Sequence, residues 1–256
     1  MIDFIRLSEE GVVNWLKSQL QKREFMYGHC FTEWEVREQI YNLLFYEGKL
    51  ETEDIERFFI PFGQAGFLSQ RQKLELMMFI CEKEYGDAIA FLYELEGNEV
   101  IRDYEIDELY LRWAFEDRLV LSSEEKREFF VQYLSDRIGL GILELLKRMT
   151  REGILLGECC PMVEGETMER RIAICNEGRL MWFPFLAPSN ENEVPRIIKQ
   201  VVAKENKGEL TMIEPFWECV REDGTCITAI RPPAGKSWGL RILYGSARRG
   251  MPEWEQ

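Results

Sequence analysis

Histidine is almost absent from this chain, which has one, His29, among 256 residues. This leaves little room for histidine-based catalysis or a histidine-rich metal site. Long apolar runs are missing too, since no stretch approaches the ~18–20 residues of a membrane helix. The first residues, Met1–Arg6, contain no basic segment followed by an apolar core, so we expect no signal peptide.

The cysteines show no Cys-x-x-Cys spacing, and their number, seven, is odd. Cys81 lies in an apolar run, which suits a buried free thiol. The adjacent Cys159 and Cys160 are either a redox or soft-metal site or two ordinary thiols in a loop. We expect free thiols, no bound metal and a reducing, cytoplasmic location.

Basic residues are outnumbered, 32 against 46 acidic ones, which gives a formal net charge of −14. Affinity for nucleic acids and anionic lipids comes chiefly from Lys and Arg, so we expect neither partner and no membrane insertion. Residues 1–138 hold 29 acidic and 16 basic residues, a net of −13, whereas residues 139–256 hold 17 and 16, a net of −1. The acidic half is either a set of solvated helix faces or a docking surface for a basic partner.

The apolar periodicity differs between the two halves. In residues 1–138 it is helical, with a possible cap at Ser8 and capping boxes at Thr32–Glu35 and Ser122–Glu125. Further helical stripes lie over residues 74–81, 106–113 and 130–138. We therefore predict an acidic, all-helical domain over residues 1–138.

Residues 139–245 are predicted to form a small α+β domain. Alternating residues and turn signals favour antiparallel hairpins over residues 171–183 and 217–231, and Leu240, Ile242 and Tyr244 suggest one more strand. An amphipathic helix capped by Ser189 or Asn190 is expected to bury an apolar face made of Val194, Ile197, Ile198, Val201 and Val202. The fold class is α+β, and residues 246–256 are a tail or the start of a linker.

One segment resembles the end of a phosphate-binding loop, Ala234-Gly235-Lys236-Ser237. The first glycine of such a loop would fall at Ile230, and Pro232 and Pro233 have no N–H groups for a phosphate. A turn between strands explains this segment better. No other catalytic motif is present, so we expect no catalytic residue and no cofactor in this chain.

Residues 122–245, read in order, resemble the N-terminal domain of type II/IV secretion-system ATPases, particularly the CpaF-like pilus-assembly branch. The most specific similarity runs from Asp223-Gly224-Thr225 to Ala229-Ile230-Arg231-Pro232-Pro233. Shorter similarities are Gly139–Leu146, Ile172–Cys175 with Gly178, Phe185, Glu193, Ile197-Ile198 and Glu214-Pro215. Cys226 and Leu243 stand where the family has arginines. Arg241 is the nearest substitute for the second, and we expect it on the other face of its strand.

The resemblance implies a non-catalytic assembly region that packs on the RecA-like motor domain of its own or a neighbouring subunit in a hexameric ring, and on platform proteins. The motor motifs are not in this sequence, so ATP and Mg²⁺ are expected only where a motor domain is present. The candidates for a nucleotide-facing edge are Arg231, Arg241, Arg248 and Arg249. Charge reversal at Arg231 is expected to weaken assembly and leave folding unchanged.

Two other functions stay open. The chain can be a stand-alone regulatory scaffold related to that domain. It can instead be a small ligand-binding or enzymatic α+β protein whose pocket uses the aromatic residues of the second half, which are Trp182, Phe183, Phe185, Phe216, Trp217 and Trp238. The competing interpretation of these aromatic residues is sheet core.

Overall fold

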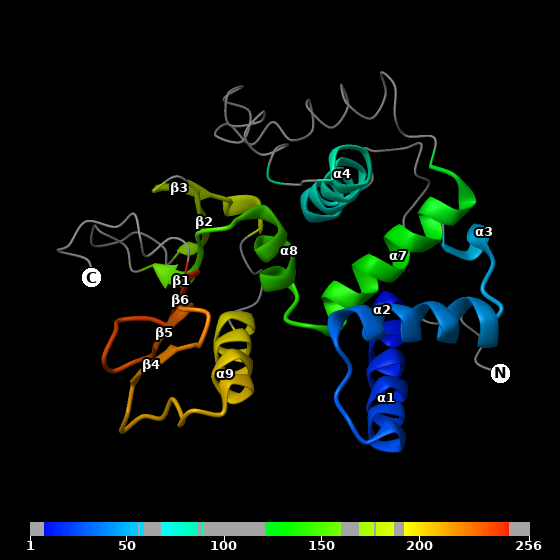
Figure 1. Cartoon of the computed structure of the whole chain (residues 1–256). Coiled ribbons are helices and arrows are strands. Elements are labelled where there is room, and N and C mark those ends of the chain that lie inside the picture. Colours follow the sequence, from blue (N-terminus) through cyan, green and yellow to red (C-terminus); the bar gives the residue numbers. More distant parts are fainter. Residues whose placement is uncertain are drawn as a thin grey trace. The chain divides into compact units, whose positions relative to one another are not determined.

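The computed structural model describes residues 8–58 except 56, residues 68–86, 89 and 121–159, residues 169–186 except 177, and residues 192–245. The chain divides into two compact units (Figure 1). The first contains the described residues up to Gly86 and residues 121–141, and the second contains residues 142–245. Helices form the first unit, and the second combines helices with a six-stranded antiparallel sheet, which confirms the α+β class. Within these ranges no helix combines the length and the apolar character needed to cross a bilayer.

Three helices of the helical unit, α1, α2 and α7, begin where the sequence predicts. Its elements are α1 (Glu9–Tyr27), α2 (Glu33–Tyr41), a π-helical turn η2 (Asn42–Glu47), α3 (Thr52–Ile55), α4 (Gln70–Tyr85) and α7 (Ser123–Ile138). The Ser8 hydroxyl caps α1, and Thr32 and Ser122 each form the predicted capping box. A third capping box, Ser69 with Gln72, starts α4. The predicted helical stripe over residues 106–113 lies outside the described residues.

Helix α7 is the centre of this unit. It packs against α1, α2, α3 and α4, and every residue from Phe129 to Asp136 is buried. The Tyr133 hydroxyl donates to the Glu9 carboxylate of α1 at 2.8 Å, and desolvation by burial is the main reason that the pKa of Tyr133 is raised. A helix buried on all sides is a core helix, so the other helices are arranged by how they cover it.

The sheet of the second unit has the strand order β3-β2-β1-β6-β5-β4. Its strands are β1 (Gly153–Cys159), β2 (Glu169–Asn176), β3 (Arg179–Trp182), β4 (Phe216–Val220), β5 (Cys226–Ile230) and β6 (Gly239–Leu243). The two predicted hairpins are confirmed as β2–β3 and β4–β5, and the additional predicted strand is β6. The sequence does not predict β1, which pairs with β2 on one side and β6 on the other and so joins the hairpins into one sheet.

Two helices, α8 (Ile142–Met149) and α9 (Glu193–Glu205), pack on one face of this sheet (Figure 1). Helix α9 buries the five apolar residues that the sequence predicts. Its N-cap position is Asn192, which makes no side-chain cap, and the predicted caps Ser189 and Asn190 lie outside the described residues. After β3 the chain makes a short 3-10 turn, η5 (Pro184–Leu186), beside the buried Phe183.

A buried hydroxyl ties the end of α8 to the first hairpin. Thr150 is 3% exposed, and its hydroxyl donates to the Cys175 carbonyl oxygen at 2.6 Å. The hydroxyl oxygen of Thr150 in turn accepts the N–H groups of Glu152 at 3.1 Å and Gly153 at 3.3 Å. Buried polar groups of the backbone need such partners, so this side chain fixes where β1 begins.

We expect Thr150→Val to destabilise the second unit by about 1–3 kcal/mol, because it keeps the side-chain shape but leaves buried backbone groups without a partner. Urea unfolding followed by circular dichroism measures the loss. Thr150→Ser keeps the hydroxyl and is expected to lose less than half as much. Equal stability of the valine variant and the wild type would show that this network does not stabilise the sheet.

Candidate functional site

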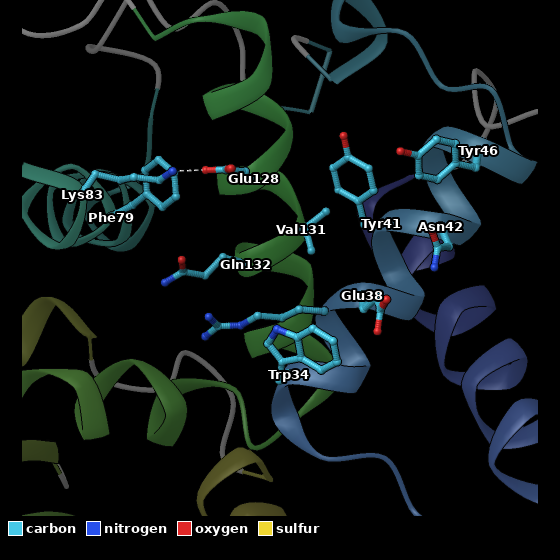
Figure 2. Close-up of a pocket in the computed structure, with 11 residues that line it drawn as sticks. Trp34, Glu38, Tyr41, Asn42, Tyr46, Phe79, Lys83, Glu128, Val131 and Gln132 are labelled. Atoms are coloured by element: carbon cyan, nitrogen blue, oxygen red, sulfur yellow. Dashed lines mark ion pairs between the residues drawn. The ribbon is translucent and has the colours of Figure 1, made fainter. Parts of the chain in front are cut away.

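The helical unit carries a groove of about 560 Å³ between α2 with η2, α7 and α4 (Figure 2). It is lined by Trp34, Arg37, Glu38, Tyr41, Asn42, Tyr46, Phe79, Lys83, Glu128, Val131 and Gln132. The buried side chains of Phe79 and Val131 supply an apolar base, whereas Trp34 and Tyr46 are 69% and 71% exposed. The volume falls in the range of ligand pockets, ~300–1,000 Å³.

One wall of the groove is an aromatic stripe on α2. Trp34, Glu38 and Tyr41 are spaced at i, i+4 and i+7, which places them on one face of the helix. Figure 2 shows Trp34 at one end of this wall and Tyr41 with Tyr46 toward the other. The stripe therefore alternates an indole, a carboxylate and a pair of phenols along the helix.

The π-helical turn brings the second phenol to this wall. In an α-helix, residues five apart point roughly 140° away from each other. In η2 the Gly48 N–H donates to the Leu43 carbonyl five residues back, at 3.0 Å, and the rings of Tyr41 and Tyr46 lie 5.7 Å apart. π-turns are rare and occur often at functional sites.

Most charged groups in the groove are paired. Lys83 forms an ion pair with Glu128, drawn as a dashed line in Figure 2, and Arg37 donates to Glu33 at 2.9 Å. The carboxylate of Glu38 has no ion-pair or hydrogen-bond partner within the described ranges. The groove therefore holds one uncompensated negative charge beside its aromatic wall.

The lining combines a large aromatic area with a few polar groups. It consists of aromatic rings, apolar side chains, amides and mostly paired charges. No group of three or more potential metal ligands occurs in the part of the chain that the structure describes. What this arrangement can do is contact a ligand over a large area and donate or accept a few hydrogen bonds.

The start of α2, next to Trp34, is fixed by an exposed polar cluster. Glu35 accepts the N–H and the hydroxyl of Thr32 at 2.8 Å each, and its other oxygen lies 3.1 Å from Nε2 of His29. These hydrogen bonds, the backbone one first, lower the pKa of Glu35 to about 2, and the bond to Glu35 raises the pKa of His29. The single histidine of the sequence thus supports a helix start.

The arginines predicted from the sequence do not form one site. Arg231 lies with its guanidinium carbon 4.7 Å from the ring centre of Trp238, and Lys199 of α9 lies 5.5 Å from the same centre. This places Arg231 on the helix-covered side of the sheet, whereas Arg241 of β6 is exposed and lies opposite Leu155 and Thr228 on the other side. Arg248 and Arg249 lie outside the described residues.

Strand β6 corrects one expectation from the sequence, and the turn before it confirms another. Arg241 and Leu243 are two residues apart in β6 and share one face, so the expectation of opposite faces is wrong. The segment Ala234-Gly235-Lys236-Ser237 connects the neighbouring antiparallel strands β5 and β6, which confirms a turn in place of a phosphate loop.

The aromatic residues of the second half are not gathered around one pocket. Phe183 and Trp217 are buried, while Trp182 and Phe216 are exposed. Trp182 lies in β3 and Trp217 in β4, the opposite edges of the sheet. The sheet therefore gives no support to a pocket built from these residues.

No pattern in the sequence identifies the groove. Its walls come from helices separated by long stretches of chain, and Phe79 and Glu128 give no sign in the sequence that they lie near Trp34. The sequence shows only that the aromatic residues Trp34, Tyr41 and Tyr46 lie among charged neighbours. The folded structure is needed to show that they form one wall of a groove whose other sides come from α7 and α4.

Neither a protein-family model nor a curated protein matches this chain. The similarity to secretion ATPases therefore rests on the motifs alone.

The packing of Arg231 changes the expected effect of reversing its charge. We expect Arg231→Glu to lower the free energy of unfolding by about 0.5–2 kcal/mol, because it removes a cation from the face of Trp238. Arg241→Glu, at an exposed position, should stay within about 0.5 kcal/mol of the wild type. Urea unfolding of both variants gives the comparison, and equal stabilities would contradict the packing role of Arg231.

The start of α2 should respond to pH in two steps. Glu35 has a folded pKa of about 2 against its ordinary 4.5, so its stabilisation is present above 4.5 and is lost as the pH falls toward 2. The pKa of His29 is raised above 6.5, so its stabilisation is present below 6.5 and is lost as the pH rises through the folded pKa. The helix start is therefore best fixed between about pH 4.5 and 6.5.

Carboxyl and imidazole NMR titrations, together with amide exchange at the start of α2, test this prediction. His29→Gln should abolish the upper step and keep the lower one. A Glu35 midpoint near 4.5 would contradict the hydrogen-bonded cap.

Proposed function

We propose that this chain is a non-catalytic protein-interaction module whose helical unit docks a segment of a partner protein in the groove. The observation that carries the proposal is the aromatic wall, where Trp34 and Tyr46 are 69% and 71% exposed beside a buried apolar base. Tryptophan and tyrosine dominate binding hot spots because each buries a large area while ordering few rotatable bonds.

The helical framework suits this role. The Arg23 guanidinium of α1 donates to Gln39 of α2 at 2.5 Å and to Glu47 at the end of η2 at 2.6 Å. These bonds hold α2 and the π-helical turn against α1, so the aromatic wall is ordered before a partner arrives. A preorganised wall loses less conformational entropy on binding.

The partner we propose is a motor subunit of a secretion or pilus-assembly ATPase, or one of its platform proteins. This choice rests on the resemblance of residues 122–245, and in this proposal ATP and Mg²⁺ bind the motor subunit. A stand-alone regulatory scaffold would use the same groove. We propose a cytoplasmic location, which is supported by the free thiols at Cys30, Cys175 and Cys219.

Site-specific photocrosslinking tests the groove. A benzoylphenylalanine at position 46, on its rim, is expected to give one discrete adduct in the source cells. The same probe at position 25, where Phe25 is 89% exposed at the end of α1, is the matched control and should not give that adduct. Trp34→Ala should lower the yield from position 46 about tenfold, as for a hot-spot residue.

Mass spectrometry identifies the crosslinked partner. An adduct with an ATPase subunit or a platform protein would support the proposed partner class. An adduct with another protein would support the docking role of the groove but exclude that partner class. Identical adducts from positions 46 and 25 would exclude the groove as the docking site. Stoichiometric micromolar binding of ATP and Mg²⁺ by this chain alone, measured by titration calorimetry, would contradict the non-catalytic assignment.

A further inference from the structure

The charge pattern of the groove indicates the chemistry of its occupant. Both cations of the lining are neutralised, Arg37 by Glu33 and Lys83 by Glu128, and Glu38 is exposed without an ion-pair partner in the described ranges. A ligand that brought a negative charge to Glu38 would be repelled. A ligand that brought a positive charge would supply the missing partner.

The neighbours of Glu38 strengthen this preference. Trp34 lies one turn before it on α2, and Tyr41 lies about one turn after it, next to Tyr46. The faces of these rings attract cations, and tryptophan does so most strongly. A carboxylate flanked by aromatic faces can therefore hold a Lys or Arg side chain through both its charge and its apolar stem.

The whole helical half reinforces the local charge. Residues 1–138 carry a net charge of −13, so a basic partner is attracted from a distance before any contact forms. The groove is lined by helices and has an apolar base made of Phe79 and Val131. Apolar grooves accept amphipathic helices, whose own anchor residues recur at i, i+3, i+4 and i+7.

We infer that the groove takes a basic amphipathic helix of the partner protein, with a Lys or Arg side chain at Glu38 and apolar anchors against Trp34 and the pair Tyr41 and Tyr46. The inference rests on the proposed function and names the partner chemistry of the same groove. Glu38 sets the preference for charge, and the aromatic residues supply the contact area.

Fluorescence anisotropy with the full chain tests the inference. The probe is a labelled 18-residue helical peptide with lysines on one face and leucines on the other, and its control is the same peptide with glutamate replacing lysine. We expect micromolar binding of the lysine peptide in ~50 mM salt, at least tenfold weaker binding of the glutamate peptide, and a loss of affinity as salt rises.

The variants separate charge from contact area. Glu38→Gln should weaken binding of the lysine peptide by about two- to fivefold, the range of an exposed ion pair, and Glu38→Lys by about tenfold. Glu209→Lys makes the same change of total charge in the other unit, at an exposed position, and should stay within twofold of the wild type. Trp34→Ala should weaken both peptides.

The outcomes are distinguishable from those of the proposed function. Equal binding of the two peptides, no binding of the lysine peptide below ~100 μM, or equal affinities of Glu38→Lys and Glu209→Lys would overturn the basic partner. The crosslink from position 46 would then still decide the docking role of the groove. Failure of that crosslink, with peptide binding unaffected by Trp34→Ala, would overturn both.

Discussion

The burial of α7 on all sides is the constraint on which the helical unit depends. From Phe129 to Asp136 every residue is buried, including the polar Gln132 and Asp136, so no side of the helix can face water. Helices α1, α2, α3 and α4 must therefore surround it. The groove lies where α2 and α4 flank α7.

The second unit depends on a different constraint, the pairing of β1 on both of its edges. Two antiparallel hairpins would each expose strand edges and be marginal in water. Between them, β1 pairs with β2 and β6, and α8 and α9 bury its residues Ile154 and Leu156. Thr150 secures the start of this strand through its hydrogen bonds to Cys175, Glu152 and Gly153.

Local signals in the sequence predicted much of this structure. The caps at Ser8, Thr32 and Ser122, the buried face of α9 and both hairpins follow from short-range hydrogen bonding and periodicity, which act within a few residues. The sequence does not predict strand β1, because Ile154-Leu155-Leu156 is a short apolar run without polar alternation, and periodicity alone does not identify such a run as a strand. The groove was missed because it depends on which helices cover α7, and no local pattern contains that information.

The π-helical turn η2 has a consequence for how this surface could be altered. A π-turn amounts to one residue inserted into an α-helix, so the turn keeps Tyr46 beside Tyr41 although five positions separate them. Converting the turn to regular α-helix at the same chain length would rotate Tyr46 to roughly 140° from Tyr41 around the helix axis. The position of Tyr46 on the wall therefore depends on the backbone hydrogen bonding of the turn, and a substitution that changed this pattern would alter the surface without replacing any of its aromatic side chains.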